Sequence, residues 1–297
     1  MDTDNSLVAR SGGTLSASVE SANALLNLRE KISQNTALVS DEWLDRLIKW
    51  ADECEIPDYL FPRDREKLRV VEKIIIPHYC NLKAYFLSKE ARVRYSKSNT
   101  YVYFCDDDFD DTDIRRLPDE LGNLCFLKTL LLDDKYIHFS GDMKLICKLK
   151  SLKSLSLLYC KFLPDKFANL QNLKYLWLNN HNFKEFPSVI TKLKKLKYIS
   201  LNHKDIVLWF SFDGKPNILF ADKPTDNPIR YGFSTLPDEF ANLQNLAMLS
   251  LLGNKFVRFP QVIFELPKLE YLWIDEYLIT PSIAQELKKR DIQVYYE

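Results

Sequence analysis

Large apolar residues recur along the chain with a fixed spacing from about residue 114 onward. In each copy, an apolar residue is followed by others three, five and ten positions later. The closely spaced apolar positions alternate with polar or aromatic ones, which is typical of a short strand with one buried face. The copies are 127–137, 152–162, 173–183, 196–206, 246–256 and 269–279.

A second signature lies between these strands and consists of an apolar residue followed by proline. Two of its copies, residues 163–173 and 236–246, agree at ten of eleven positions. Such agreement indicates an internal repeat rather than chance. The dipeptides are Leu117-Pro118, Leu163-Pro164, Phe186-Pro187, Leu236-Pro237 and Phe259-Pro260.

The spacing between first-position leucines gives the length of the unit. Successive intervals from Leu127 to Leu269 are 25, 21, 23, 50 and 23 residues, so the unit is about 23 residues long. The long interval predicts one degenerate 27-residue unit over 207–235. Within it, residues 207–212 and 217–220 flank Asp-Gly-Lys-Pro, which predicts a β-hairpin insertion. The insertion is either a binding element or a neutral sequence change in a loop that tolerates variation.

These motifs resemble the leucine-rich-repeat family, in particular its short bacterial and intracellular Ras-group type. The resemblance covers residues 114–279, and Val71, Ile74 and Ile76 are candidates for a divergent first strand. It implies an α/β fold, a leucine-rich-repeat solenoid with a curved parallel sheet on its concave face. In this family an asparagine fills a polar slot in each turn. Asn254 and Cys160 fit that slot, whereas the following residues depart from it and predict turns that are looser or satisfied another way: Lys135, His181, Lys204 and Tyr277.

The two ends predict caps, because terminal repeats would otherwise expose apolar faces. We expect a disordered tail over 1–17, an α-helical N-terminal cap over 18–68, the repeat domain over 69–279 and a helix-strand cap over 280–297. Trp43 and Trp50 of the first cap either pack on the first repeat or form a partner-binding edge.

Composition narrows the classes of function. Lysine plus arginine equals aspartate plus glutamate, 41 against 41, which disfavours nucleic acid and anionic membrane as partners. The six cysteines lack C-x-x-C spacing, so we expect small buried side chains in a reducing compartment. No secretory signal opens the chain and no apolar run reaches transmembrane length. The expectation is a cytoplasmic monomer, with non-classical export as an alternative.

Catalytic and metal motifs are missing from the sequence. The four histidines form no metal-like pair, and no phosphate-binding or nucleophile-elbow motif occurs. Residues 106–113 form an acidic run, which is either a calcium site without the usual glycine or, as we favour, a solvated loop.

Some bacterial repeat effectors carry a ubiquitin-ligase domain with a catalytic cysteine. Here every cysteine lies at or before Cys160 and no such domain follows. We therefore expect no enzyme, no cofactor and no metal.

The concave face is the candidate binding site, because the residues between inward leucines align in columns when the repeats stack. Tyrosine and tryptophan in two of these columns are typical of binding hot spots. The alternative is that they are contacts between neighbouring strands. We expect a non-catalytic scaffold that binds a protein partner, with self-association through the edge strand near Tyr295 as another possibility. The predicted binding residues are Tyr175, Trp177, Asn180, Tyr198, His203, Tyr271, Trp273 and Glu276.

Overall fold

The computed structural model describes residues 41–54, 56, 58, 61–76, 117–132, 139–157, 160–203, 206–210, 216–220 and 232–296. The tail predicted over 1–17, residues 18–40 of the predicted N-terminal cap and the acidic run 106–113 lie outside these residues. The chain divides into two compact units, Met1–Asp45 and Arg46–Glu297, and the second contains the repeats.

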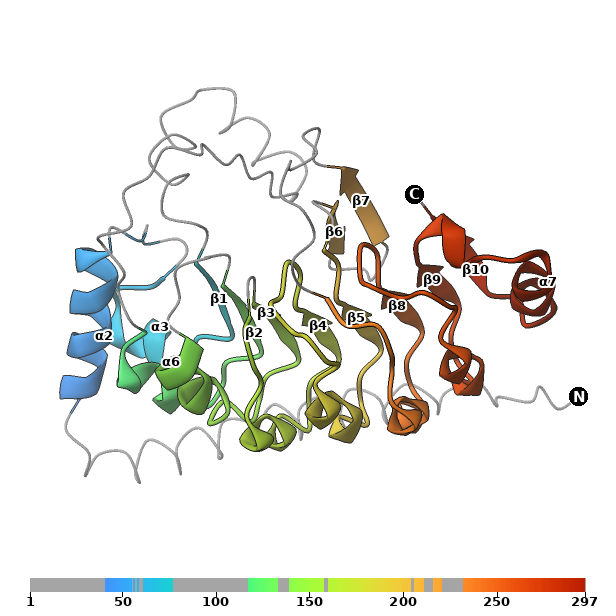
Figure 1. Ribbon diagram of the computed structural model, residues 1–297. Helices are drawn as coiled ribbons and strands as arrows, with labels where there is room; N and C mark the ends of the chain where they lie inside the picture. Colours follow the sequence, from blue (N-terminus) through green and yellow to red (C-terminus); the bar gives the residue numbers. More distant parts are fainter. Residues whose placement is uncertain are drawn as a thin grey trace, which may run out of the picture. The chain divides into compact units, whose positions relative to one another are not determined.

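Eight strands within the described residues form one parallel sheet (Figure 1). The register places equivalent leucines side by side, for example Leu130, Leu155 and Leu176, all of which are fully buried. Each strand thus covers the apolar face of the next, and the fold is that of a leucine-rich-repeat solenoid, as predicted. In order the strands are β1 (Lys73–Ile76), β2 (Thr129–Leu132), β3 (Ser154–Leu157), β4 (Tyr175–Trp177), β5 (Tyr198–Ser200), β8 (Met248–Ser250), β9 (Tyr271–Trp273) and β10 (Gln293–Tyr295).

Short 3-10 helices follow the proline dipeptides and lie together on one side of the sheet (Figure 1). Each begins directly after its proline, whose φ is close to −70°. Proline fits this position because its fixed φ suits the turn and no hydrogen bond needs its nitrogen. One longer helix, α6 (Phe139–Ile146), precedes β3. The 3-10 helices are η1 (Asp119–Asn123), η2 (Asp165–Asn169), η3 (Ser188–Lys192), η4 (Asp238–Asn242) and η5 (Gln261–Glu265).

Helices precede the first strand, as predicted for the N-terminal cap. Helix α2 spans Glu42–Glu53, and the short helix α3 (Arg65–Arg69) is capped by the Asp64 side chain, which accepts from the Lys67 amide at 2.8 Å. Trp50 packs edge-on against the buried ring of Phe61. This contact lies within the N-terminal cap, and packing of Trp50 on the first repeat stays a prediction.

The C-terminal end is closed by a 3-10 helix, an α-helix and a strand. Helix η6 spans Glu276–Leu278, and α7 (Pro281–Lys289) starts at Thr280, whose hydroxyl accepts from the amide of Ile283. Strand β10 then pairs in parallel with β9. The helix-strand cap predicted from the sequence is thus present, and β10 is the last strand of the sheet.

The long interval between repeats does not hold a repeat of its own. Strand β5 pairs directly with β8, so the degenerate unit predicted over 207–235 adds no strand to the sheet. Its first half holds the antiparallel pair β6 (Ile206–Phe210) and β7 (Pro216–Phe220), a separate two-stranded sheet. Ile206, predicted as an inward position, belongs to β6. Phe233 takes the inward place instead, because its ring packs between His181, Phe186 and Phe256.

Candidate functional site

The alternate residues of the strands line up on one face of the sheet, which we call the open face. The register places Tyr175 beside Tyr198, and it places Ser250 beside Trp273, which in turn lies beside Tyr295. The columns predicted from the repeat spacing are therefore real neighbours in space.

Three aromatic residues form the first cluster on this face: Tyr175, Trp177 and Tyr198. The Tyr175 and Trp177 rings stack at 6.2 Å between centroids, and Trp177 tilts against Tyr198 at 5.4 Å. Tyr198 is only 1% exposed, and burial raises the pKa of its hydroxyl, an effect that the nearby Ser200 and Trp177 side chains partly oppose. We call this group the β4–β5 cluster.

A matching cluster, the β9–β10 cluster, consists of Tyr271, Trp273 and Tyr295. The Trp273 ring stacks on both tyrosines, at 6.2 Å from Tyr271 and 5.1 Å from Tyr295. Leu252 packs against the same tryptophan and is buried with it. Each cluster thus contains one buried ring, which lies at the centre of the β9–β10 cluster and at the end of the β4–β5 cluster.

Two of the predicted binding residues are thus buried rather than exposed. Tyr198 and Trp273 are 1% and 2% exposed, and each contacts at least one ring of its cluster. Tyr175, Trp177 and Tyr271 are half-buried, and they keep surface for a partner. Tyr295 was not among the predicted contact residues, although it is 39% exposed and completes the second cluster. The alternating pattern of residues 291–296 could have indicated Tyr295, because it predicts a further strand that extends the column of Trp273 by one residue.

A chain of polar side chains, the amide ladder, lies between the two clusters and was not predicted. The Asn179 amide oxygen accepts from the Ser200 hydroxyl at 2.6 Å and from the backbone N–H of Asn202 at 3.3 Å. The Asn202 amide oxygen repeats this one strand on, accepting from Ser250 at 2.7 Å and from the N–H of Leu252 at 3.1 Å. All four polar residues are buried. The ladder ties β4, β5 and β8 together across the centre of the open face.

The residues predicted just past the strands have different roles. Asn180 adopts a left-handed conformation with φ of 52°, which asparagine tolerates better than most residues, so it serves the turn. Glu276 is exposed at the start of η6 and is free to meet a partner's charge. His203 is half-buried, and its Nε2 lies 3.1 Å from Nδ1 of His181.

His181 occupies the place of the family's asparagine, and His203 lies against it. His181 is fully buried and its Nδ1 accepts from the amide of Phe183, so the proton between the two rings belongs to His203 Nε2. Burial lowers the pKa of His181 to about 2, with His203 adding to the effect and backbone hydrogen bonds opposing it. Burial likewise lowers the pKa of His203 to about 4, with a contribution from Lys255. Both rings are therefore neutral at pH 7.

The other polar slots are filled by different means. Asn254 donates to the carbonyls of Leu201 and Leu251, at 2.7 and 2.9 Å, as the repeat pattern predicts. Cys160 contacts the carbonyl of Phe162, and burial raises the pKa of its thiol to about 12. Tyr277, which departs from the pattern, reaches the carbonyl of Phe256 through its hydroxyl at 2.9 Å. These turns are satisfied by other groups rather than left loose, and Lys135 and Lys204 lie outside the described residues.

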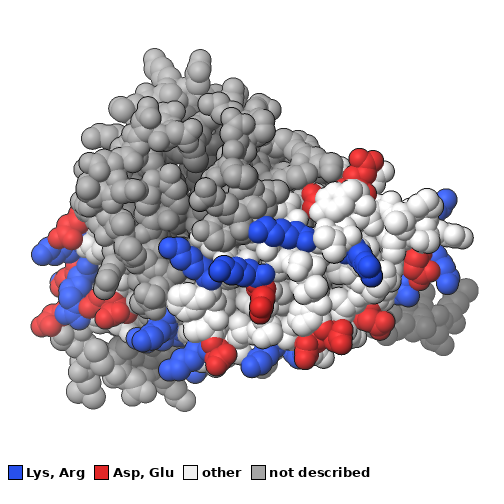
Figure 2. All heavy atoms as spheres, in the orientation of Figure 1, with Lys and Arg blue, Asp and Glu red and all other residues white. Residues whose placement is uncertain are grey.

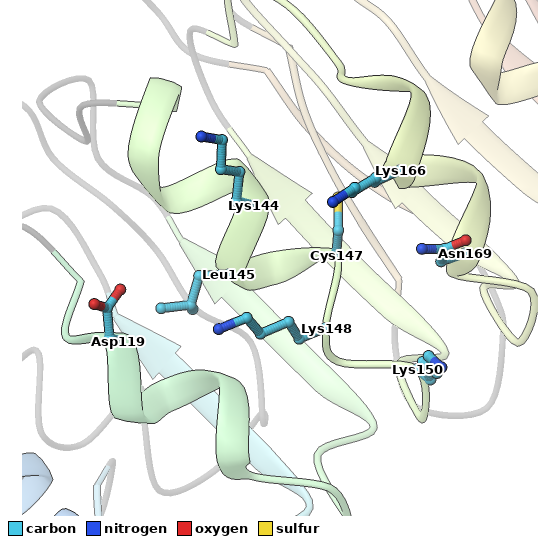
Figure 3. A pocket seen from close by; sticks show the side chains of 8 residues that line it. All are labelled: Asp119, Lys144, Leu145, Cys147, Lys148, Lys150, Lys166 and Asn169. Atoms are coloured by element: carbon cyan, nitrogen blue, oxygen red, sulfur yellow. The ribbon is translucent and has the colours of Figure 1, made fainter.

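A cavity of about 640 Å³ opens on the helix side of the sheet between η1, α6 and η2 (Figure 3). Figure 3 shows Lys166 extending from η2 toward Cys147, and Lys148 extending toward Leu145. Burial raises the pKa of the Cys147 thiol to about 11, against the opposing effect of Lys166. The thiol is therefore protonated at neutral pH and is a poor nucleophile. The full lining is Asp119, Lys144, Leu145, Cys147, Lys148, Lys150, Lys166 and Asn169.

Within the described part of the chain, no group of three or more histidine, cysteine, aspartate or glutamate side chains is arranged to hold a metal ion. None of the helices described here is long and apolar enough to cross a membrane. Cys54, Cys147 and Cys160 are buried as expected, whereas Cys125 is exposed.

Neither a protein-family model nor a curated protein sequence matches the chain. Solved structures are similar over part of it. A leucine-rich-repeat protein of Leptospira interrogans is 22% identical, with a TM-score of 0.41, over 61% of this chain and 46% of that one. An internalin of Listeria monocytogenes is 13% identical, with a TM-score of 0.42, over 61% and 44%. The Arabidopsis receptor kinase HAESA, solved with the peptide hormone IDA and the co-receptor SERK1, is 21% identical, with a TM-score of 0.38, over 55% and 24%.

The chain therefore spans less than half the length of each of these three proteins. The assignment of the leucine-rich-repeat fold rests on the strands, prolines and buried leucines described above. Repeat proteins of this architecture typically present an extended surface for interaction with other proteins.

Proposed function

We propose that this protein is a non-catalytic interaction scaffold that binds a protein partner on the open face of its sheet. The observation that carries the proposal is the pair of aromatic clusters, each built on one buried ring. Tyr175, Trp177 and Tyr271 offer partial surface, and Tyr295 is 39% exposed. We further propose a reducing, cytoplasmic setting, which suits the free thiols of Cys147 and Cys160.

Aromatic side chains held in this way are suited to binding. Tyrosine and tryptophan bury much area on contact and have few rotatable bonds to immobilise. Here Tyr175 stacks on Trp177, and Tyr271 and Tyr295 stack on Trp273, so these rings are held before any partner arrives and the entropy cost of association is lower. The exposed Glu276 beyond β9 would form part of a polar rim.

The test compares two double variants of the full chain. Tyr175→Ala with Tyr295→Ala removes one outer ring from each cluster. Phe162→Ala with Val257→Ala removes apolar side chains that are 42% and 84% exposed and lie outside the strands. Crosslinking in native lysate, followed by mass spectrometry, identifies proteins captured by the unmodified chain. The proposal expects the first variant to lose a captured partner that the second retains, with melting temperatures of both close to the unmodified protein.

The same samples address the alternatives. If both variants lose the partner equally, the clusters do not carry binding. If the captured species is a second copy of this chain, joined near Tyr295, the protein is a self-association module through β10. Sedimentation at several concentrations then shows dimers that Tyr295→Ala disrupts.

A further inference from the structure

Four lysines stand in line at the beginning of consecutive strands, directly before the columns of the open face. The backbone N–H of Lys153 donates to the carbonyl of Lys128 at 2.7 Å, Lys174 donates to Lys153 at 2.8 Å, and Lys197 donates to Lys174 at 2.8 Å. We call these four residues the lysine column. Neighbouring strands are about 4.8 Å apart, so the column is about 15 Å long.

Like charges side by side on neighbouring strands repel one another and weaken a sheet. At Lys128 an ion pair with Glu72 offsets this repulsion. Lys153, Lys174 and Lys197 form no ion pair with any residue that the structure describes, and two of them, Lys153 and Lys197, are exposed. The chain as a whole has equal numbers of acidic and basic residues, and both signs are mixed over the face drawn in Figure 2. The column is thus a local excess of positive charge.

An acidic residue adjoins the lysine column at one end and lies two strands away at the other. The amide of Lys128 bonds to the carbonyl of Glu72 at one end. At the other end the strand beside Lys197 has Ala247 in the equivalent position, and the strand after that has the exposed Glu270. A length of about 15 Å matches about four residues of an extended polypeptide, whose rise is about 3.3 Å per residue. A nucleic acid strand would favour a longer basic track without acidic ends.

The lysine column adjoins the β4–β5 cluster. Lys174 directly precedes Tyr175, and Lys197 directly precedes Tyr198. A chain lying along the column would place its carboxylates at the lysines and its apolar side chains against the half-buried rings of Tyr175 and Trp177. This arrangement fits a segment in which acidic and aromatic or aliphatic residues alternate.

From the charge, the length and this adjacency, we infer that the partner bound on the open face presents a short, extended acidic segment to Lys153, Lys174 and Lys197. The inference rests on the proposed function and specifies the chemistry of its partner. The lysines add long-range attraction that speeds association, and the aromatic rings hold the bound segment.

Fluorescence anisotropy of the full chain with labelled synthetic peptides tests this inference. The probes are an alternating Glu-Tyr peptide, a Gln-Tyr peptide and a Lys-Tyr peptide of the same length, together with a labelled oligothymidylate. The column variant is Lys153→Glu with Lys174→Glu and Lys197→Glu. The matched control is Lys161→Glu with Lys184→Glu and Lys192→Glu, which reverses three exposed charges outside the column.

We expect the Glu-Tyr peptide to bind tightest at low salt and to weaken as ionic strength rises to about 0.3 M. The column variant should bind it at least about tenfold more weakly, while the control stays within about twofold. Equal losses in the two variants would overturn the inference, as would tighter binding of the oligothymidylate. Circular dichroism of each variant shows that the fold is retained.

The failure of this inference can be told apart from the failure of the proposed function. If acidic and neutral peptides bind alike, and Tyr175→Ala with Tyr295→Ala abolishes both, the aromatic scaffold stands and the acidic partner is wrong. If binding of the acidic peptide depends on the lysines but ignores the two tyrosines, the lysine column stands and the aromatic surface is wrong. If no peptide binds at any salt concentration, the acidic-segment inference is wrong.

Discussion

The indole ring of Trp273 stacks on the phenol ring of Tyr295, with 5.1 Å between the ring centroids and 14° between their planes. The two residues differ in how much of their surface is exposed. Trp273 is 2% exposed, whereas Tyr295 is 39% exposed. The tryptophan therefore belongs to the packing of the sheet and the tyrosine to its surface.

This inequality predicts different stabilities for two alanine variants. Trp273→Ala removes a buried ring and should lower the free energy of unfolding by about 3–5 kcal/mol. Tyr295→Ala should lower it by about 1 kcal/mol, since most of what it removes is one stacking contact. Urea denaturation followed by circular dichroism measures both. Similar losses in the two variants would mean that Trp273 is not the buried residue on which the other rings of the β9–β10 cluster pack.

The His181–His203 pair predicts a dependence of stability on pH. The folded-state pKa of His181 is lowered to about 2, whereas the ordinary pKa of a histidine is 6.5. The unfolded chain therefore binds a proton that the folded chain excludes, and the stabilisation present above pH 6.5 is lost as the pH falls below it. Between pH 7 and pH 5, His181 should account for a loss of about 2 kcal/mol.

The variant His181→Asn restores the side chain that the repeat pattern usually places in this slot. Its free energy of unfolding should fall less between pH 7 and pH 5 than that of the unmodified protein, and the difference should vanish above pH 7. Urea titrations at each pH provide the comparison. An unchanged slope in the variant would contradict the assignment of the proton uptake to this histidine.

The insertion between β5 and β8 predicts that part of the chain can be removed. A Cβ at Gly232 would lie 3.4 Å from Cδ2 of His203, so the two ends of the inserted segment are neighbours. Deleting residues 204–231 reduces the Leu196–Leu246 spacing from 50 to 22 residues, which is within the length of a repeat. The shortened chain should unfold cooperatively, with a melting temperature within a few degrees of the unmodified protein. Loss of a single cooperative transition would show that the segment is needed for folding.

The amide ladder predicts that alanine substitutions of two asparagines lower the free energy of unfolding by very different amounts. Asn202→Ala leaves the Ser250 hydroxyl and the Leu252 N–H without their acceptor in a buried site, and should cost about 2–4 kcal/mol. Asn172→Ala removes an exposed hydrogen bond to the carbonyl of Lys150 and should cost less than about 1 kcal/mol. Thermal denaturation of the two variants, run in parallel, provides the measurement. Equal effects would mean that the ladder is no more than a surface network.

The sequence was sufficient to predict the strands, because leucine spacing alone decides which side chains face inward. It was not sufficient to predict which outward rings keep their exposure. Tyr198 and Tyr175 occupy equivalent positions and both contact the Trp177 ring, yet only Tyr198 is buried, because exposure depends on the surroundings in space and not on the repeat position. The spacing also misplaced Ile206, since a leucine count cannot show where an insertion leaves the repeat. Phe233, far along the chain, fills that inward position.

The amide ladder also bears on how such a chain can change during evolution. Asn179 accepts from side-chain and backbone donors one repeat later, and Asn202 does the same toward the repeat after that. A recombination boundary between any two of these repeats would separate a donor from its acceptor inside the protein. Repeats 173–195, 196–245 and 246–268 are therefore expected to be inherited, duplicated or lost as a block, while the outer repeats can be exchanged singly.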